Sequence, residues 1–253
     1  MEVWKEYKNG NEINGINVIT IPEDANEANA TIDQSAEDII ALPKDTRVLT
    51  RDILLGRMLS KPKQIGWQAM HRQYLQDMTH LHMDRKKLSS VSVNAPGTNK
   101  PILGECCPSL QVLFLQDNYL TNLGNAFQGL KNLTQINLYG NFISQMDCFE
   151  DCVNLRKLYM EHNRISHLKG LQNCQRLEEL YLGNQKIRKH QEFIFDEYSL
   201  AAISNTLEVL DLPAVNLVIC KPLYFLERLT TLNLNDNLID DFDEQVSPML
   251  MTL

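Results

Sequence analysis

One spacing of hydrophobic and polar positions recurs along most of this chain. It reads L-x-x-L-x-L-x-x-N-x-(I/L), and it is most regular between Leu110 and Ile239. The ninth position of each unit follows the previous one by 23, 22, 22, 30 and 22 residues. A period of this length is typical of a protein built from stacked structural repeats. Positions four and six alternate with polar residues, which predicts a short strand with one face buried.

The repeating unit indicates the fold class. It is similar to the leucine-rich repeat, whose short strands stack side by side. A degenerate unit with Lys86 at its ninth position precedes the regular ones, so we expect about seven repeats. We therefore predict an α/β fold, namely a leucine-rich repeat solenoid with a parallel concave sheet and short helices or turns on the convex side. Such a stack offers a curved open surface rather than an enclosed catalytic pocket.

Two insertions interrupt the period. The first lies within residues 91–106 and contains Pro96, Gly97 and Pro101. The second, residues 191–205, accounts for the 30-residue step, and its apolar and acidic residues predict a short helix. Val215 stands at the ninth position of the next unit and lacks an amide, so we expect the neighbouring insertion to distort that turn.

The chain before the repeats divides into two segments. Residues 1–47 form an acidic extension in which two stretches, Ile13–Ile21 and Ala36–Leu42, are apolar enough to dock as a strand and a helical turn. We expect a neighbouring protein to order this extension, because its composition favours disorder when it is alone. Residues 48–77 predict a helical cap, with Thr50 capping a first helix and a second helix over residues 64–77. A cap is needed because the end of a solenoid core is otherwise exposed.

The repeat domain spans residues 78–253. A further repeat is expected to begin near residue 250, and the spacing of Leu250 and Leu253 fits its start at the point where the sequence stops. We interpret the last repeat as truncated.

The ninth-position amides are predicted to be structural. An amide both donates and accepts hydrogen bonds, so it can satisfy the backbone groups of adjacent turns. Gln185 is a plausible substitute for asparagine at this position. The column is formed by Asn118, Asn141, Asn163 and Asn237.

Positions three, five and seven are predicted to face the concave surface. Four aromatic residues there suggest a band across the middle repeats, and acidic residues on its C-terminal side favour a partner with a basic patch. The alternative is that exposed tyrosines simply favour strands. The residues expected to bind a partner are Phe114, Tyr139, Tyr159, Glu161, Glu179, Tyr181 and Asp211.

Charge and hydropathy argue against nucleic acid and membrane as binding partners. The net charge is −8, and residues 1–46 hold ten acidic and three basic residues, which argues against nucleic acid as the main partner. The sequence has no run of 18 apolar residues and no signal peptide, so we expect no membrane contact and an intracellular protein.

The cysteines and histidines predict no metal site, cofactor or catalytic centre. Cys107, Cys152 and Cys174 share one column with leucines, and Cys220 falls in another apolar column, so we interpret all four as core residues. The sequence has no C-x-x-C pair for zinc and no known nucleophile or phosphate-binding motif. We therefore expect a protein that is not an enzyme.

The chain from residue 48 onward resembles the protein phosphatase 1 regulatory subunit 42 family. The similar stretches are Leu49-Thr50-Arg51-Asp52, Lys61-Pro62-Lys63, Thr79-His80-Leu81, Leu180-Tyr181-Leu182, Asn184-Gln185 and Phe195-Asp196. A separate stretch, Lys63 to Trp67, fits the loose (K/R)-x-(V/I)-x-(F/W) pattern that this phosphatase reads, although packing in the cap explains it as well. The first 47 residues have no counterpart in the family, and the family's basic C-terminal end is absent.

The resemblance implies a regulator or scaffold of protein phosphatase 1 that grips the catalytic subunit with its concave face. It implies a cytoplasmic, cytoskeletal setting at microtubule-based structures such as the cilium, basal body or centrosome. The alternative is a structural component of the axoneme that anchors other proteins to tubulin or axonemal partners without binding the phosphatase.

Overall fold

The computed structural model describes residues 16–19, 40–55 and 67–240. The described residues up to Thr46 form one compact unit and those from Arg47 onward form another. In the first unit, β1 (Ile16–Ile19) pairs antiparallel with β2 (Ile40–Pro43). The strand expected within residues 13–21 is therefore present. The helical turn expected over residues 36–42 is wrong for Ile40 to Leu42, because pairing with β1 satisfies their backbone groups instead.

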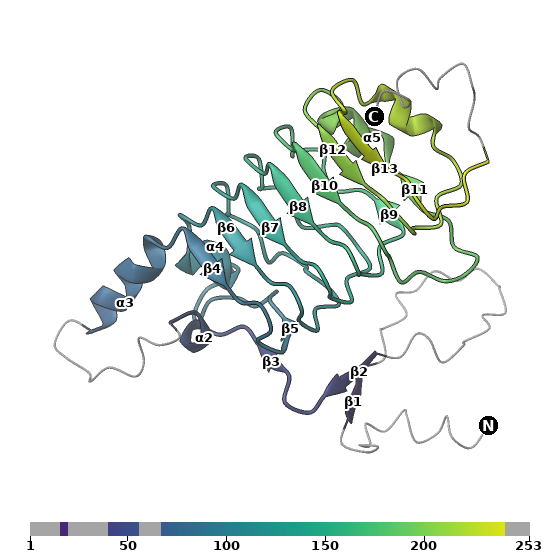
Figure 1. Cartoon of the computed structure of the whole chain (residues 1–253). Helices are drawn as coiled ribbons and strands as arrows, with labels where there is room; N and C mark the ends of the chain where they lie inside the picture. Colours follow the sequence, from purple (N-terminus) through teal and green to yellow (C-terminus); the bar gives the residue numbers. More distant parts are fainter. Residues whose placement is uncertain (1–15, 20–39, 56–66, 241–253) are drawn as a thin grey trace. The chain divides into compact units, whose positions relative to one another are not determined.

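The second unit contains one parallel sheet of seven strands, each three residues long (Figure 1). The strands follow the order of the sequence, and neighbouring strands pair in register without a shift. This arrangement confirms the predicted leucine-rich repeat solenoid and its seven units. The strands are β4 (His80–His82), β6 (Val112–Phe114), β7 (Gln135–Asn137), β8 (Lys157–Tyr159), β10 (Glu179–Tyr181), β12 (Val209–Asp211) and β13 (Thr231–Asn233).

Backbone geometry fixes both ends of each strand. Before the strand, two successive N–H groups donate to one carbonyl of the preceding repeat, as Thr134 and Gln135 do to Gln111 O at 2.8 and 3.1 Å. After the strand, the eighth residue of every repeat has a positive φ, which turns the chain away from the sheet. These residues are Arg85, Asp117, Gly140, His162, Asn184, Ala214 and Asp236, with φ between 52° and 65°.

The core lies between the sheet and the convex side. The inward residues at position four are fully buried from β6 to β12, for example Leu158 and Leu180. Cys107, Cys152 and Cys174 are also fully buried, as is Cys220, which confirms their interpretation as core residues. Burial raises the pKa of the Cys107 and Cys174 thiols to about 12, so they stay protonated and unreactive.

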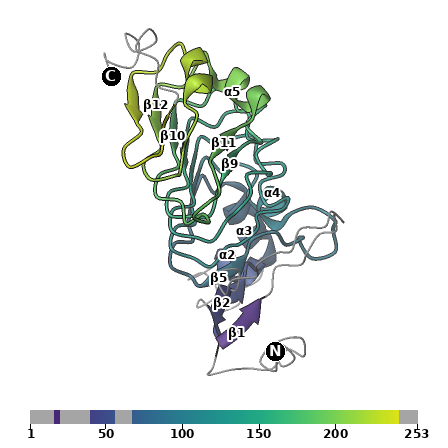
Figure 2. The same ribbon diagram turned by 90° about the vertical axis from the view of Figure 1, so that its right-hand side faces the viewer.

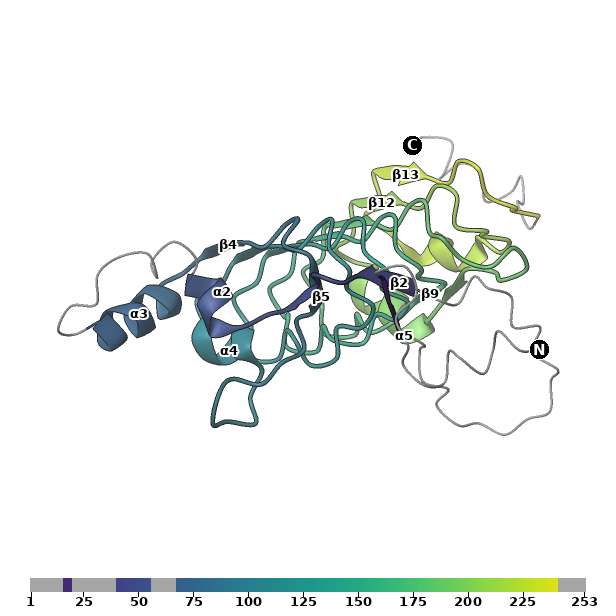
Figure 3. The same ribbon diagram turned by 90° about the horizontal axis from the view of Figure 1, so that it is seen from below.

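The N-terminal end of the stack carries the two predicted helices, α2 (Arg51–Leu55) and α3 (Trp67–Gln76) (Figure 3). The Thr50 hydroxyl accepts a hydrogen bond from the Ile53 N–H at 3.3 Å, as expected of a cap residue. Leu54 and Leu75 are buried in the same core cluster as the repeat leucines. A short strand, β3 (Arg47–Val48), pairs parallel with β5 (Leu88–Ser90) of the first repeat.

The insertions supply most of the structure on the convex side. Figure 2 shows α4 (Ile102–Cys106), β9 (His167–Leu168), β11 (Ile194–Phe195) and α5 (Glu197–Ile203) on the side away from β10 and β12. The short helix expected in the second insertion is confirmed. It begins after Asp196, whose side chain accepts a hydrogen bond from the Ser199 N–H at 2.8 Å. A 3₁₀ helix, η3 (Lys221–Phe225), contacts α5.

The two repeats without a ninth-position amide turn differently from the others. In these repeats the tenth residue also has a positive φ, 58° at Lys87 and 56° at Asn216. Each of these two turns forms hydrogen bonds with a segment that the regular repeats lack. The Arg47 N–H donates to Lys87 O, while the Asn216 side chain donates to the carbonyls of Arg188 and Gln191. The distortion expected beside Val215 is therefore present, although the strand register continues through it.

Among the described helices, none is long and apolar enough to cross a membrane. The predicted start of a further repeat at Leu250 lies outside the described residues, as do residues 1–15 and 20–39 of the acidic extension.

Candidate protein-binding surface

The outward side chains of the seven strands form one continuous surface, which we call the concave face. It is occupied by positions three, five and seven of each repeat. Because the strands pair in register, position five forms a single row across the sheet. In chain order this row is His82, Phe114, Asn137, Tyr159, Tyr181, Asp211 and Asn233.

The aromatic residues of this row form two separate pairs. His82 stacks on Phe114 with ring centroids 4.6 Å apart, and Tyr159 stacks on Tyr181 at 4.7 Å with an interplanar angle of 6°. Asn137 separates the two pairs. Within the row, the aromatic residues of the predicted band are thus arranged as two stacked pairs. Aromatic stacking contributes about 0.5–1.5 kcal/mol per pair beyond burial, so each pair is held in a defined orientation.

Tyr139 lies outside the position-five row. It occupies position seven of its repeat, is among the exposed large hydrophobic side chains, and its ring meets the His162 imidazole edge-on at 4.9 Å. His82 and His162 were not among the predicted binding residues. His82 shares position five with Phe114, so its place in the column could have identified it.

Polar contacts hold the Tyr159–Tyr181 pair in place. Both hydroxyls donate to Glu179 Oε2, at 3.5 Å from Tyr159 and 3.2 Å from Tyr181. Lys157 Nζ forms an ion pair with Glu179 Oε1 at 2.7 Å. Desolvation by burial, followed by the charge of Glu179, raises the pKa of Tyr181 to about 12. The two tyrosines are therefore neutral hydroxyl donors in a preorganised patch.

Glu161 is electrostatically unusual on this surface. Its Oε2 atom is buried and has no hydrogen-bond partner in the structure. Desolvation raises the pKa of Glu161 to about 7, and the nearby charge of Asp211 acts in the same direction. Gln116, also at position seven, has a buried Oε1 without a partner. Two acceptor oxygens of the concave face are thus left without protein donors.

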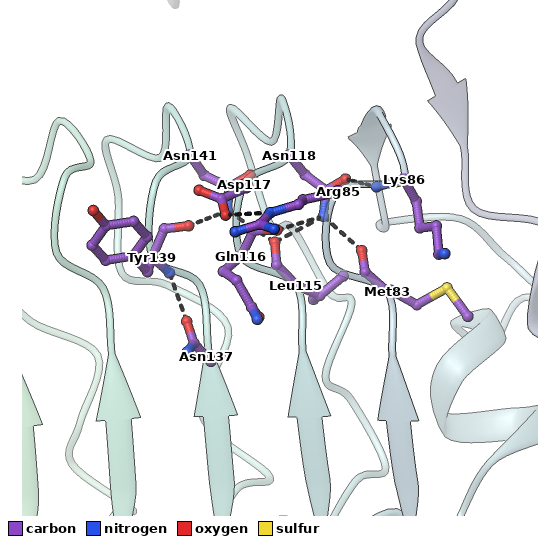
Figure 4. Close-up of polar contacts among 10 residues, drawn as sticks. All are labelled: Met83, Arg85, Lys86, Leu115, Gln116, Asp117, Asn118, Asn137, Tyr139 and Asn141. Atoms are coloured by element: carbon purple, nitrogen blue, oxygen red, sulfur yellow. Dashed lines mark hydrogen bonds and ion pairs between the residues drawn. The ribbon is translucent and has the colours of Figure 1, made fainter.

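The ninth-position amides behave as predicted. Asn141 Nδ2 donates to Leu115 O and to Leu138 O, both at 3.0 Å, and its Oδ1 accepts from the Leu120 N–H at 3.1 Å. The other members of the column, Asn118, Asn163 and Asn237, make equivalent contacts. Figure 4 shows Asn118 and Asn141 beside the backbone of adjacent turns. They stabilise the stack and lie behind the binding surface.

Gln185 replaces asparagine without loss of these contacts. Its Nε2 donates to Met160 O at 2.9 Å and to Leu182 O at 2.8 Å, and its Oε1 accepts from the Ile165 N–H at 2.8 Å.

An ion pair lies at the edge of the concave face near its N-terminal end. Arg85 Nε lies 3.0 Å from Asp117 Oδ2, and both residues are position-eight residues of successive repeats (Figure 4). The pair is largely exposed, so it contributes little to stability.

Other candidate sites are less well supported. Within the described part of the chain, no group of three or more His, Cys, Asp or Glu residues is placed to hold a metal ion. The possible phosphatase-docking stretch at residues 63–67 lies outside the described residues except for the backbone of Trp67, which begins α3.

Comparison with known proteins agrees with the fold. A family model described as "Leucine Rich repeats (2 copies)" matches residues 108–150 and 153–190. These residues include the four repeats that contain β6, β7, β8 and β10. No curated protein matches the chain.

Several solved structures share the fold at low sequence identity. The TLR13–ssRNA13 complex matches with a TM-score of 0.58 and 24% identity over 72% of this chain and 25% of that one. A leucine-rich repeat protein of Leptospira interrogans matches with a TM-score of 0.54 and 21% identity, over 72% and 49%. An octameric complex of Latrophilin 3, Unc5D and FLRT2 matches with a TM-score of 0.50 and 19% identity, over 66% and 48%. The chain thus spans between about a quarter and about half of these structures.

Proposed function

We propose that this chain, which has a leucine-rich repeat fold, acts as a non-enzymatic scaffold that binds protein partners through its concave face. Leucine-rich repeat domains generally serve as protein-binding scaffolds, because their stacked strands create an extended surface. The observation that carries the proposal is the stacked pair of Tyr159 and Tyr181, fixed by Glu179. Rigid aromatic side chains lose little entropy on binding and often dominate interface energetics.

We further propose that one partner is the catalytic subunit of protein phosphatase 1, bound at microtubule-based structures of the cytoskeleton such as the cilium, basal body or centrosome. The support for this partner is the resemblance of the cap and the fifth repeat to the regulatory subunit 42 family. Leu180-Tyr181-Leu182 lies in that resemblance and also contributes a member of the tyrosine pair.

The proposal is tested by replacing Tyr159 and Tyr181 together with alanine. We expect capture of the purified catalytic subunit to fall by at least about 30-fold, because truncating a central aromatic anchor typically costs about 2 kcal/mol or more. Affinity is measured by surface plasmon resonance, and circular dichroism melting shows whether the variant remains folded.

The matched control is Tyr198→Ala. Tyr198 lies on α5 with 77% of its surface exposed, away from the sheet, so its loss should leave binding unchanged. Unaltered affinity of a folded Tyr159→Ala/Tyr181→Ala protein would exclude this surface as the phosphatase site. Absence of any binding by the wild-type chain would exclude the phosphatase as the partner.

A second candidate function is structural anchoring in the axoneme without phosphatase binding. The observation that favours it is the separate, acidic N-terminal unit, in which residues 1–46 carry ten acidic and three basic residues. We expect the full chain to remain with salt-washed axonemes and the form lacking residues 1–46 to be released. Retention of the shortened form would contradict this function.

A further inference from the structure

A single glycine shapes the middle of the concave face. Gly183 occupies position seven of its repeat, and the register of β8 and β10 places it beside Glu161. On its other side a Cβ atom would meet two carbons of Pro213 at 2.6 Å and Asp211 Oδ2 at 3.2 Å. Because Gly183 has no side chain, Asp211 can lean over it toward Glu161.

The two carboxyl groups that flank Gly183 are incompletely satisfied within the chain. Glu161 Oε2 is buried and has no hydrogen-bond partner. Asp211 uses Oδ1 to accept from Asn233 Nδ2 at 2.7 Å, which leaves Oδ2 directed at the space above Gly183. The charge of Asp211 disfavours ionisation of Glu161, so a cation placed between the two groups would be favoured.

The surrounding charges do not supply that cation. Lys157, the basic residue on β8, is already paired with Glu179 at 2.7 Å. The tyrosines of β8 and β10 direct their hydroxyls to the same Glu179 carboxylate. The register of β7 and β8 places Tyr139 on the other side of Glu161, so the neighbours on adjacent strands are Asp211, three tyrosines and a compensated ion pair.

We propose that Glu161 and Asp211, beside the stacked rings of Tyr159 and Tyr181, receive one cationic side chain from a basic segment of a protein partner. This inference rests on the proposed function, because it specifies the chemistry of a partner docked on the concave face. The cation forms an ion pair with the Glu161 carboxylate and donates a hydrogen bond to Asp211 Oδ2, while its stem packs on the tyrosine rings. An arginine fits better than a lysine, since its planar guanidinium both stacks on aromatic faces and offers donors to two carboxylates.

The site is tested with small probes in place of a partner. The isotope-labelled full chain is titrated with acetyl-arginine amide, acetyl-lysine amide and acetyl-citrulline amide, and NMR follows the backbone signals of residues 159–162, 181–183 and 211. Citrulline is the neutral counterpart of arginine, so it separates charge recognition from shape. We expect saturable shifts with the two cationic probes, tighter for arginine, and none with citrulline.

Two isosteric variants locate the binding to these carboxyls. Glu161→Gln and Asp211→Asn should each weaken arginine binding by about threefold or more, as expected for removal of one part-buried ion pair. Glu192→Gln removes the same charge from an exposed position in the second insertion and should have no effect. Equal binding of citrulline, an unchanged affinity in both variants, or the absence of saturable shifts would overturn the proposal.

The outcomes separate this inference from the proposed function. Probe binding without phosphatase binding would leave the cation site standing and remove only the named partner. Phosphatase binding that survives Glu161→Gln and Asp211→Asn would support the function and contradict the cation site.

Discussion

In the repeats of Gln116 and Glu161, the side chains at positions seven and nine lie only two residues apart, yet their hydrogen bonds are satisfied in opposite ways. At position nine, Asn163 is fully buried and its side chain forms hydrogen bonds of 3.0 Å to Leu138 O and Met160 O and from the Ile143 N–H. At position seven, Gln116 Oε1 and Glu161 Oε2 are buried without any partner.

This difference indicates that position nine serves the stability of the fold and that position seven is available for binding. A buried amide with all its bonds made holds neighbouring repeats together. A buried acceptor left unpaired costs free energy, about 1–3 kcal/mol, and so lowers the stability of the fold. Loss of the amide at position nine should therefore destabilise the fold, whereas changes at position seven should alter binding and can even raise stability.

The largest expected effect follows from Asn163→Ala. This change leaves the Ile143 N–H in the interior without a partner and removes one of the two amide donors from both Leu138 O and Met160 O, so we expect the free energy of unfolding to fall by about 3 kcal/mol. Urea denaturation followed by circular dichroism measures the change. Asn205→Ala, at an exposed position after α5, should change stability by less than about 0.5 kcal/mol. A similar stability for the two variants would show that the column does not hold the stack together.

A smaller effect should distinguish the reshaped turn from the regular ones. Val215→Asn places an amide at a site where the side chain is fully buried and the turn is already organised by Asn216, so we expect destabilisation by about 2 kcal/mol. Gln185→Asn should cost less than about 1 kcal/mol, because the same turn in the preceding repeat holds Asn163 with equivalent contacts. Thermal melting compares the pair, and a Val215→Asn protein more stable than the wild type would contradict the assignment.

The smallest effect concerns Glu161 and depends on pH. Burial raises its pKa from 4.5 to about 7, so between these values the folded state binds more protons than the unfolded state. Stability from this group is present below pH 4.5 and is lost as the pH rises to about 7. Glu161→Gln removes the ionisation, and its melting temperature should rise relative to the wild type across this window. A constant difference between pH 4.5 and 8 would contradict the raised pKa.

Much of the fold was predictable because it depends on residue types at fixed spacing. The leucine, cysteine and asparagine columns each follow from one pattern, and the register of the strands follows from the same period. The strand at Ile40 could not be predicted from the pattern of residues 36–42 alone, since its backbone pairs with β1, which lies well before it in the sequence. Local pattern does not specify such long-range pairing.

The candidate site was less predictable than the fold. Sequence position identified the outward residues, but Tyr139 was grouped with Tyr159 and Tyr181 although it stands two places further along its repeat. The unpaired oxygen of Glu161 and the approach of Asp211 over Gly183 depend on side-chain packing across three repeats, which spacing alone does not determine.

The turn at Asn216 also bears on how such arrays can be shortened or recombined. Its amide serves Arg188 and Gln191 of the preceding repeat, so the second insertion and this turn form one interdependent module. Deleting the insertion would restore the 22-residue period but would leave the Asn216 amide without its acceptors. Val215 and Asn216 would therefore have to be replaced at the same time by the residues of a regular repeat. A better place to join or remove repeats therefore lies between Asn141 and Asn163, because the repeats on both sides have an asparagine at position nine with equivalent hydrogen bonds.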